Sequence, residues 1–156
     1  MNTPVDRDAE HQLAGFLARF TPEIAALGER AITRMRRRLP GANLLVYDNY
    51  NALAVGFSPS EKSSQGVFSI AIFPRRVALF LLRGAAMPDP HGIFEGAGNQ
   101  MRNITLDSVA RLDHPHVAEA MDEALERNPI PDAPPGRLII KSISAKQRPR
   151  RPVGDG

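Results

Sequence analysis

The chain has 156 residues, 42% hydrophobic and 24% charged, which is typical of one soluble globular domain and excludes a chain that is disordered throughout. It contains no cysteine, so disulfide scaffolds, thiolate metal sites and cysteine nucleophiles are excluded as well. The net charge of +3 is unevenly distributed: residues 137–156 alone sum to +5 and the first 136 residues to −2, so the body of the chain is not basic.

Two amphipathic helices are predicted at the start of the chain. Residues 8–19 carry apolar side chains at helical spacing, continued by Phe20. The second helix, at about 22–39, begins after Thr21, a good N-cap, and has Pro22 at its first position, where the missing N–H costs nothing. The pattern indicates two helices that each bury one face.

The period then changes to two, which is typical of strands. Four strands are predicted, at Leu44–Tyr50, Ala52–Phe57, Val67–Phe73 and Arg76–Leu82. Their separators are short and turn-like, which favours antiparallel neighbours. The last of the four is apolar on both faces, so we expect it to be central or covered on both sides.

A loop rich in glycine and proline, residues 83–101, leads to a fifth strand at Arg102–Leu106. A final helix is predicted with Asp113 as its cap, followed by a proline-rich link and a possible edge strand at Leu138–Ile143. From Lys146 onward we expect disorder or an extended arm. The predicted fold is α+β, an antiparallel sheet of five or six strands with helices packed on one face.

One stretch resembles a known family. Residues 76–106 contain an apolar strand ending in Arg-Gly, then Met-Pro-Asp-Pro, Glu-Gly-Ala-Gly and Met-Arg-Asn-Ile. This order is similar to the signature of the YdhG-like family, small bacterial domains of unknown function. The resemblance extends over roughly residues 10–152 and predicts a single YdhG-like domain at 1–136, followed at 137–156 by the possible edge strand and a basic Pro/Arg tail.

The resemblance implies a compact sandwich of helices against an antiparallel sheet, often compared with frataxin. It implies no activity for most members, although one has been described as a frataxin-like iron carrier. Frataxin's acidic ridge lies on its first helix and first strand. The second helix here, its expected counterpart, carries five arginines against Glu23 and Glu29, which disfavours metal carriage.

The long loop is the first place to expect a ligand site, because glycine- and proline-rich loops often carry convergent polar groups. The candidate ligand-binding residues are Arg83, Asp89, His91, Glu95 and Arg102. The structural alternative is that this loop only packs over the sheet.

Three further patterns have both a functional and a structural interpretation. Residues 95–100, Glu-Gly-Ala-Gly-Asn-Gln, resemble a phosphate cradle, but a turn that needs positive φ explains them better. Residues 113–116, Asp-His-Pro-His, suggest a metal site, but they also read as a helix start. The acidic stripe between Glu119 and Glu126 is typical of a solvated helix face. We therefore predict no metal site and no cofactor.

Basic residues support a second class of function, binding of nucleic acid or another anionic polymer. The candidate anion-binding residues lie on the second helix and in the tail: Arg30, Arg34, Arg37, Lys146, Arg148, Arg150 and Arg151. A salt-bridged helix flank and a solubilising arm are the structural alternatives.

No catalytic signature is present, which lowers the expectation of an enzyme without excluding one.

The longest apolar run, Val77–Leu82, is far shorter than the roughly 20 residues of a membrane span, and the charged start lacks the apolar segment of a secretory signal. We therefore expect a cytoplasmic, non-catalytic binding module that recognises a small ligand or a protein partner. Nucleic-acid binding is the first alternative and metal carriage the second.

Overall fold

Two helices precede the sheet in the computed structural model, which describes residues 4–152: α1 (Pro4–Leu17) and α2 (Pro22–Arg38). Thr21 takes the N-cap position of α2 with extended backbone, and Pro22 opens the helix. The apolar stripe of α2 is buried, with Ala31 at 0% exposed and Met35 at 1% exposed. Both predicted helices are therefore confirmed.

No helix within the described residues is long and apolar enough to cross a membrane.

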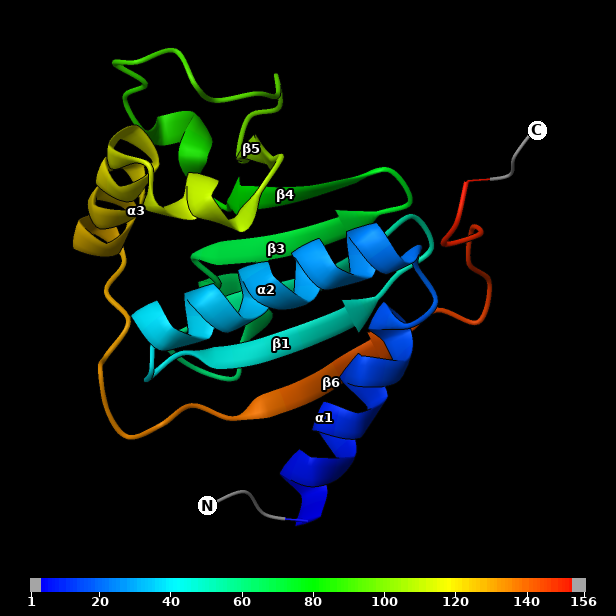
Figure 1. Cartoon of the computed structure of the whole chain (residues 1–156). Helices are drawn as coiled ribbons and strands as arrows, with labels where there is room; N and C mark the ends of the chain where they lie inside the picture. The colour runs from blue at the N-terminus through cyan, green and yellow to red at the C-terminus, as the bar shows by residue number, and fades with distance from the viewer. Residues whose placement is uncertain (1–3, 153–156) are drawn as a thin grey trace.

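Five strands form an antiparallel meander: β1 (Asn43–Asp48), β2 (Leu53–Ser58), β3 (Phe68–Phe73), β4 (Arg76–Leu81) and β5 (Arg102–Leu106). A sixth strand, β6 (Leu138–Ile143), lies at the edge beside β1. The order across the sheet is β5-β4-β3-β2-β1-β6 (Figure 1). The α+β class and the edge strand are confirmed.

The expectation of a wholly antiparallel sheet was wrong, because β6 pairs with β1 in parallel. After β5 the chain passes through α3 (Pro115–Arg127) and a long link, then crosses to the far edge of the sheet. Figure 1 shows this link running past the end of the sheet and entering β6 from the end at which β1 also begins. A connection that contains a helix is long enough for such a parallel crossover, whereas a hairpin is not.

The face of the sheet toward α2 carries the large aliphatic and aromatic side chains. Paired residues form rows across it, such as Val46–Val55–Ile70–Leu79–Ile104, in which every member is 0% exposed. α2 lies across these rows and α1 lies beside β6 (Figure 1). Burial of this apolar surface is the main contribution to the stability of the domain.

The start of α3 differs from the prediction. A short 3-10 helix, Val109–Asp113, precedes it, and His114 rather than Asp113 is the N-cap. The His114 ring accepts a hydrogen bond from the backbone N–H of His116, which satisfies one of the free donors of the first turn. Asp113 is thereby left to pair with Arg34 of α2, so it fastens α3 to α2 and does not cap the helix.

Candidate functional site

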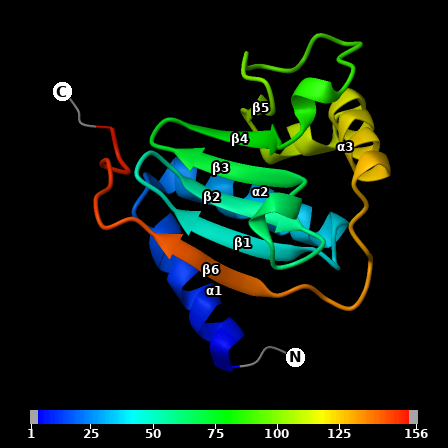
Figure 2. The ribbon, with the colours of Figure 1, turned by 180° about the vertical axis from the view of Figure 1, so that it is seen from behind.

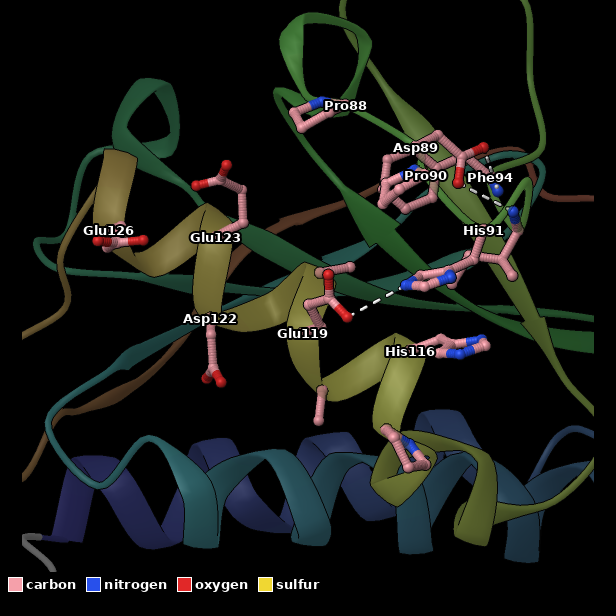
Figure 3. Close-up of a pocket in the computed structure, with 14 residues that line it drawn as sticks. Pro88, Asp89, Pro90, His91, Phe94, His116, Glu119, Asp122, Glu123 and Glu126 are labelled. Carbon is pink, nitrogen blue, oxygen red and sulfur yellow. Dashed lines mark hydrogen bonds and ion pairs between the residues drawn. The ribbon is translucent and has the colours of Figure 1, made fainter.

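The loop after β4 lies against α3, and the two enclose a groove of about 430 Å³ (Figure 3). Two of the five predicted ligand-binding residues, Asp89 and His91, line it. The opposite wall is α3 with its acidic residues, and Ile93 and Phe94 supply apolar surface. The groove thus combines acidic side chains with apolar surface.

Most of the polar side chains that line this groove have structural partners within the chain. Asp89 accepts hydrogen bonds from the backbone N–H groups of Ile93 and Phe94, at 2.9 and 3.1 Å. His91 Nε2 lies 3.1 Å from Glu119 Oε2, and its ring stacks on that of His116 (Figure 3).

Two more carboxylates of the acidic stripe on α3 are paired. Asp122 pairs with Arg38 of α2, and Glu123 lies 3.8 Å from Arg127. These contacts fix the loop to α3 and α3 to α2, which favours the structural interpretation of both the loop and the stripe.

The other three predicted residues lie elsewhere. Arg83 donates to Asn128 and, at 3.0 Å, to the carbonyl of Ser64. Arg102 donates to the carbonyl of Met101 at 2.8 Å. The five candidates therefore do not form one site.

Glu95, the last of the five, binds the neighbouring strand. Its side chain accepts a hydrogen bond from the backbone N–H of Thr105 at 3.1 Å. This bond, helped by the positive charges of Arg76 and Arg111, holds the pKa of the exposed Glu95 carboxyl below its ordinary value. Gly96, which follows it, has φ of 108°, so the turn interpretation of residues 95–100 is confirmed at this position.

Among residues 4–152, no group of three or more histidine or acidic side chains is arranged to hold a metal ion.

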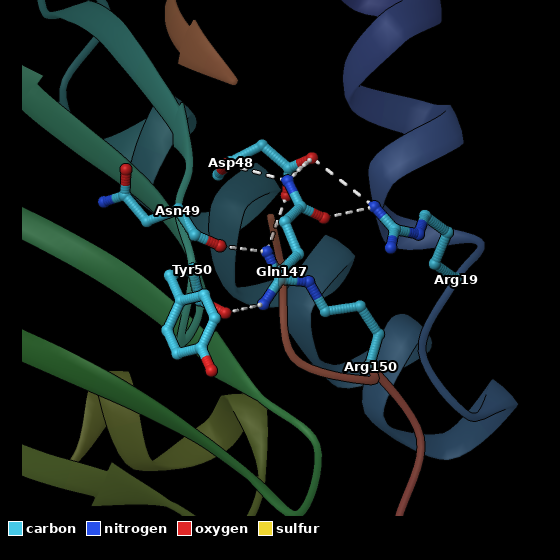
Figure 4. A network of polar contacts seen from close by, with 6 residues as sticks. All are labelled: Arg19, Asp48, Asn49, Tyr50, Gln147 and Arg150. Atoms are coloured by element: carbon cyan, nitrogen blue, oxygen red, sulfur yellow. Dashed lines mark hydrogen bonds and ion pairs between the residues drawn. The ribbon is translucent and has the colours of Figure 1, made fainter. Parts of the chain in front are cut away.

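The tail after Lys146, for which disorder or an extended arm was expected, is packed against the end of β1 over the residues that the structure describes. Arg150 is 3% exposed, and its Nη2 donates to Asp48 Oδ1 at 2.9 Å (Figure 4). Gln147 donates to Asp48 Oδ2 at 2.8 Å, and the Arg148 N–H donates to the carbonyl of Tyr50 at 2.9 Å. The segment is held because Asp48, at the end of β1, is itself buried and needs a partner.

The anion-binding candidates thus separate into groups. Arg150 is buried in an ion pair and Arg34 is paired with Asp113, so neither is available to a ligand. Arg30 and Arg37 are exposed on α2, and Lys146, Arg148 and Arg151 are exposed in the tail.

The opposite face of the sheet holds a second cavity, which no sequence pattern was used to predict. None of the three described α-helices lies over this face (Figure 2). Its central strands carry small residues in paired positions: Ala54 faces Ala71, and Gly56 faces Ser69. The flanking strands carry large ones, Tyr47 beside Ala54 and Phe80 beside Ser69.

The large side chains of the flanking strands rise on either side of the small ones of β2 and β3, and a hollow of about 400 Å³ lies between them. We call it the outer hollow. Its lining is Leu45, Tyr47, Asn49, Ala54, Gly56, Ser63, Gly66, Ser69, Ala71, Phe80, Leu82 and Met101. None of these residues is charged. The polar groups include the Tyr47 hydroxyl, which bonds the Ser63 hydroxyl, and the amide of Asn49.

A signal for the outer hollow exists in the sequence. In both Leu53–Ser58 and Phe68–Phe73, large residues alternate with alanine, glycine or serine. Since successive side chains of a strand point to opposite faces, this alternation gives one bulky face and one of small residues. Two adjacent strands with this alternation in matching register make a trough.

No protein-family model, no curated protein and no solved structure matches this chain.

Proposed function

We propose that this chain is a non-catalytic binding module whose outer hollow takes a small, neutral, largely apolar molecule. The observation that carries the proposal is the cavity of about 400 Å³ on the face of the sheet that no described α-helix covers, lined by twelve residues without one charge. Binding sites for small molecules are concave and mostly apolar, with a few polar groups that orient the ligand. The outer hollow has this composition, whereas the groove at α3 is lined by acidic side chains, most of which pair with other residues of the chain.

The chemistry of the ligand follows from the lining. A charged molecule would lose its hydration without gaining an opposite charge, which costs free energy. A neutral aromatic or polycyclic body fits between the Tyr47 and Phe80 walls, over Ala54 and Ala71. One hydrogen-bonding group at its edge would meet Asn49 or the Tyr47–Ser63 hydroxyl pair.

Membership of the YdhG-like family and a frataxin-like fold remain part of the proposal. They are supported by the residues quoted for 76–106, which form β4, the long loop and β5, and by helices that precede a mostly antiparallel sheet. Metal carriage stays the disfavoured alternative, because the exposed side of α2 is rich in arginine.

Binding can be tested with N-phenyl-1-naphthylamine, a neutral aromatic probe that fluoresces more strongly in apolar surroundings. We expect saturable enhancement with one site per chain. Ala71→Leu fills the floor of the outer hollow and should weaken binding by about tenfold or more, which corresponds to ~1.4 kcal/mol. Ala110→Leu adds the same atoms at an exposed position of the 3-10 helix before α3 and is the matched control.

Two outcomes would contradict the proposal. One is equal binding by Ala71→Leu and the control. The other is self-association through this face, seen as a dimer in sedimentation equilibrium that Ala71→Leu dissociates. The melting temperature of each variant shows separately whether the added side chain has disturbed the fold.

A further inference from the structure

Four arginines from two distant parts of the chain line one groove at the tip of the β3–β4 hairpin. Arg75 and Arg76 come from the turn and the start of β4, and Arg148 and Arg151 come from the tail. The groove has a volume of about 670 Å³, and no acidic residue lines it. We call it the arginine groove.

Among the described residues, these four guanidinium groups make no ion pair with a carboxylate. Arg76 donates to the Thr105 hydroxyl at 3.1 Å and lies over the Phe73 ring, 5.0 Å from its centroid. Arg151 donates to the carbonyl of Arg19 at 3.2 Å.

No acidic residue lines the arginine groove itself, but Arg75 and Arg76 also line a neighbouring depression together with Glu23, Asp107 and Arg30. The charge of Arg76 also acts on the Glu95 carboxyl. Within the described part of the chain these carboxylates form no direct ion pair with the four arginines, so the guanidinium groups keep donors for a ligand.

The position of the tail arginines is fixed by the network around Asp48. Arg150 is buried between Arg148 and Arg151, and the backbone N–H of Arg148 bonds the carbonyl of Tyr50. Arg148 and Arg151 themselves are exposed. The buried Arg150 thus holds the positive charges of Arg148 and Arg151 opposite the hairpin. Because these two side chains are already positioned, binding an anion costs less conformational entropy than it would for a free tail.

We propose that the arginine groove binds the phosphates of single-stranded nucleic acid, independently of base sequence. Four guanidinium groups match a row of phosphates, and arginine binds phosphate with two parallel hydrogen bonds. Tyr50, which is 41% exposed, lies beside the groove with Arg148 5.5 Å from its ring centroid. An exposed aromatic ring next to a positive groove is the combination that binds unpaired bases by stacking. This is a second site, separate from the outer hollow, which is uncharged.

The test is fluorescence anisotropy with a labelled twelve-nucleotide oligo(dT), over a range of salt concentrations. Four contacts predict a salt slope of up to about −2.8, at roughly 0.7 per phosphate of a single strand. Arg75→Ala/Arg148→Ala removes one charge from each wall and should reduce the slope by about 1.4 and the affinity by about tenfold. Both residues are exposed, so the variant should fold. Arg7→Ala/Lys62→Ala removes two exposed charges elsewhere, neither of them an anion-binding candidate, and is the matched control.

Each alternative gives a different result. Oligo(dA) should bind as oligo(dT) does, because the phosphates dominate. Equal losses in the two double variants would mean diffuse attraction to net charge and would overturn the proposal. Tighter binding of a duplex of the same length would overturn the single-strand assignment. Full competition by equimolar inorganic triphosphate would show a site for small phosphates instead. No binding at low salt would end the proposal.

Discussion

Arg150 Nη2 lies 2.9 Å from Asp48 Oδ1, and both side chains are almost completely buried. The two residues are separated by 102 positions, so the pair ties the tail to the end of β1. Without Arg150, the buried Asp48 would keep only Gln147 and the half-exposed Arg19, whose Nη1 lies 3.6 Å from Asp48 Oδ2. Breaking a buried pair by removing one partner costs about 3–5 kcal/mol.

We therefore expect Arg150→Ala to reduce the free energy of unfolding by about 3–5 kcal/mol in urea denaturation. Truncation after Ser144 should cost at least as much, because it also removes Gln147. Arg148→Ala is the control, since its side chain is exposed and should change stability by less than about 0.5 kcal/mol. Equal stability of Arg150→Ala and the intact chain would show that the tail is not anchored.

The contribution of the core can be measured at Leu81, which is 0% exposed on the helix-facing side of β4. Leu81→Ala should lower the free energy of unfolding by about 2–5 kcal/mol. Ile143→Ala, at a residue that is 52% exposed on β6, should have little effect. An unchanged melting temperature for Leu81→Ala would contradict the sheet order.

The close approach of the link before β6 to the segment before β1 can be tested at Gly136. A Cβ atom at this position would lie 1.8 Å from the carbonyl oxygen of Ala42, just before β1, so the two segments approach too closely for any side chain. Gly136→Ala should therefore cost about 1–3 kcal/mol or more, measured by thermal unfolding. Gly98→Ala is the matched control, because nothing lies within 4 Å of its added atom.

The elements of the fold could be predicted from local patterns, but their partners could not. Stretches rich in Val, Ile, Leu and Phe between turn-like separators predicted the strands, including Leu138–Ile143, since these signals lie within each segment. The parallel direction of β6 depends on the path that α3 and the link take to the far edge of the sheet. No local sequence pattern encodes that path.

The same holds for the candidate sites. The arginine pattern of the tail gave no indication that Arg150 would be buried, because its partner Asp48 is remote in sequence. The long loop offered polar residues, but three of the five point to different neighbours once it folds. The small residues of β2 and β3 were visible in the sequence, yet they form a hollow only when the two strands pair in matching register.

Glu95 predicts a pH dependence. Since the pKa of its carboxyl is lowered in the folded state, its contribution to stability is fully present above the ordinary glutamate pKa, about 4.3, and is lost as the pH falls through the lower folded value. Glu95→Gln does not ionise, so its stability should decline less than that of the parent chain on acidification below about pH 4. Parallel stability curves for the two proteins, measured by urea denaturation at several pH values, would show that the bond to Thr105 contributes nothing.

Amide chemical shifts of ¹⁵N-labelled protein titrated with N-phenyl-1-naphthylamine distinguish the outer hollow from the groove at α3 as the site of a small apolar ligand. We expect saturable shifts concentrated at outer-hollow residues such as Gly56, Ala71 and Phe80. Shifts concentrated at His91 and Glu119, or no saturable shifts at all, would contradict this expectation.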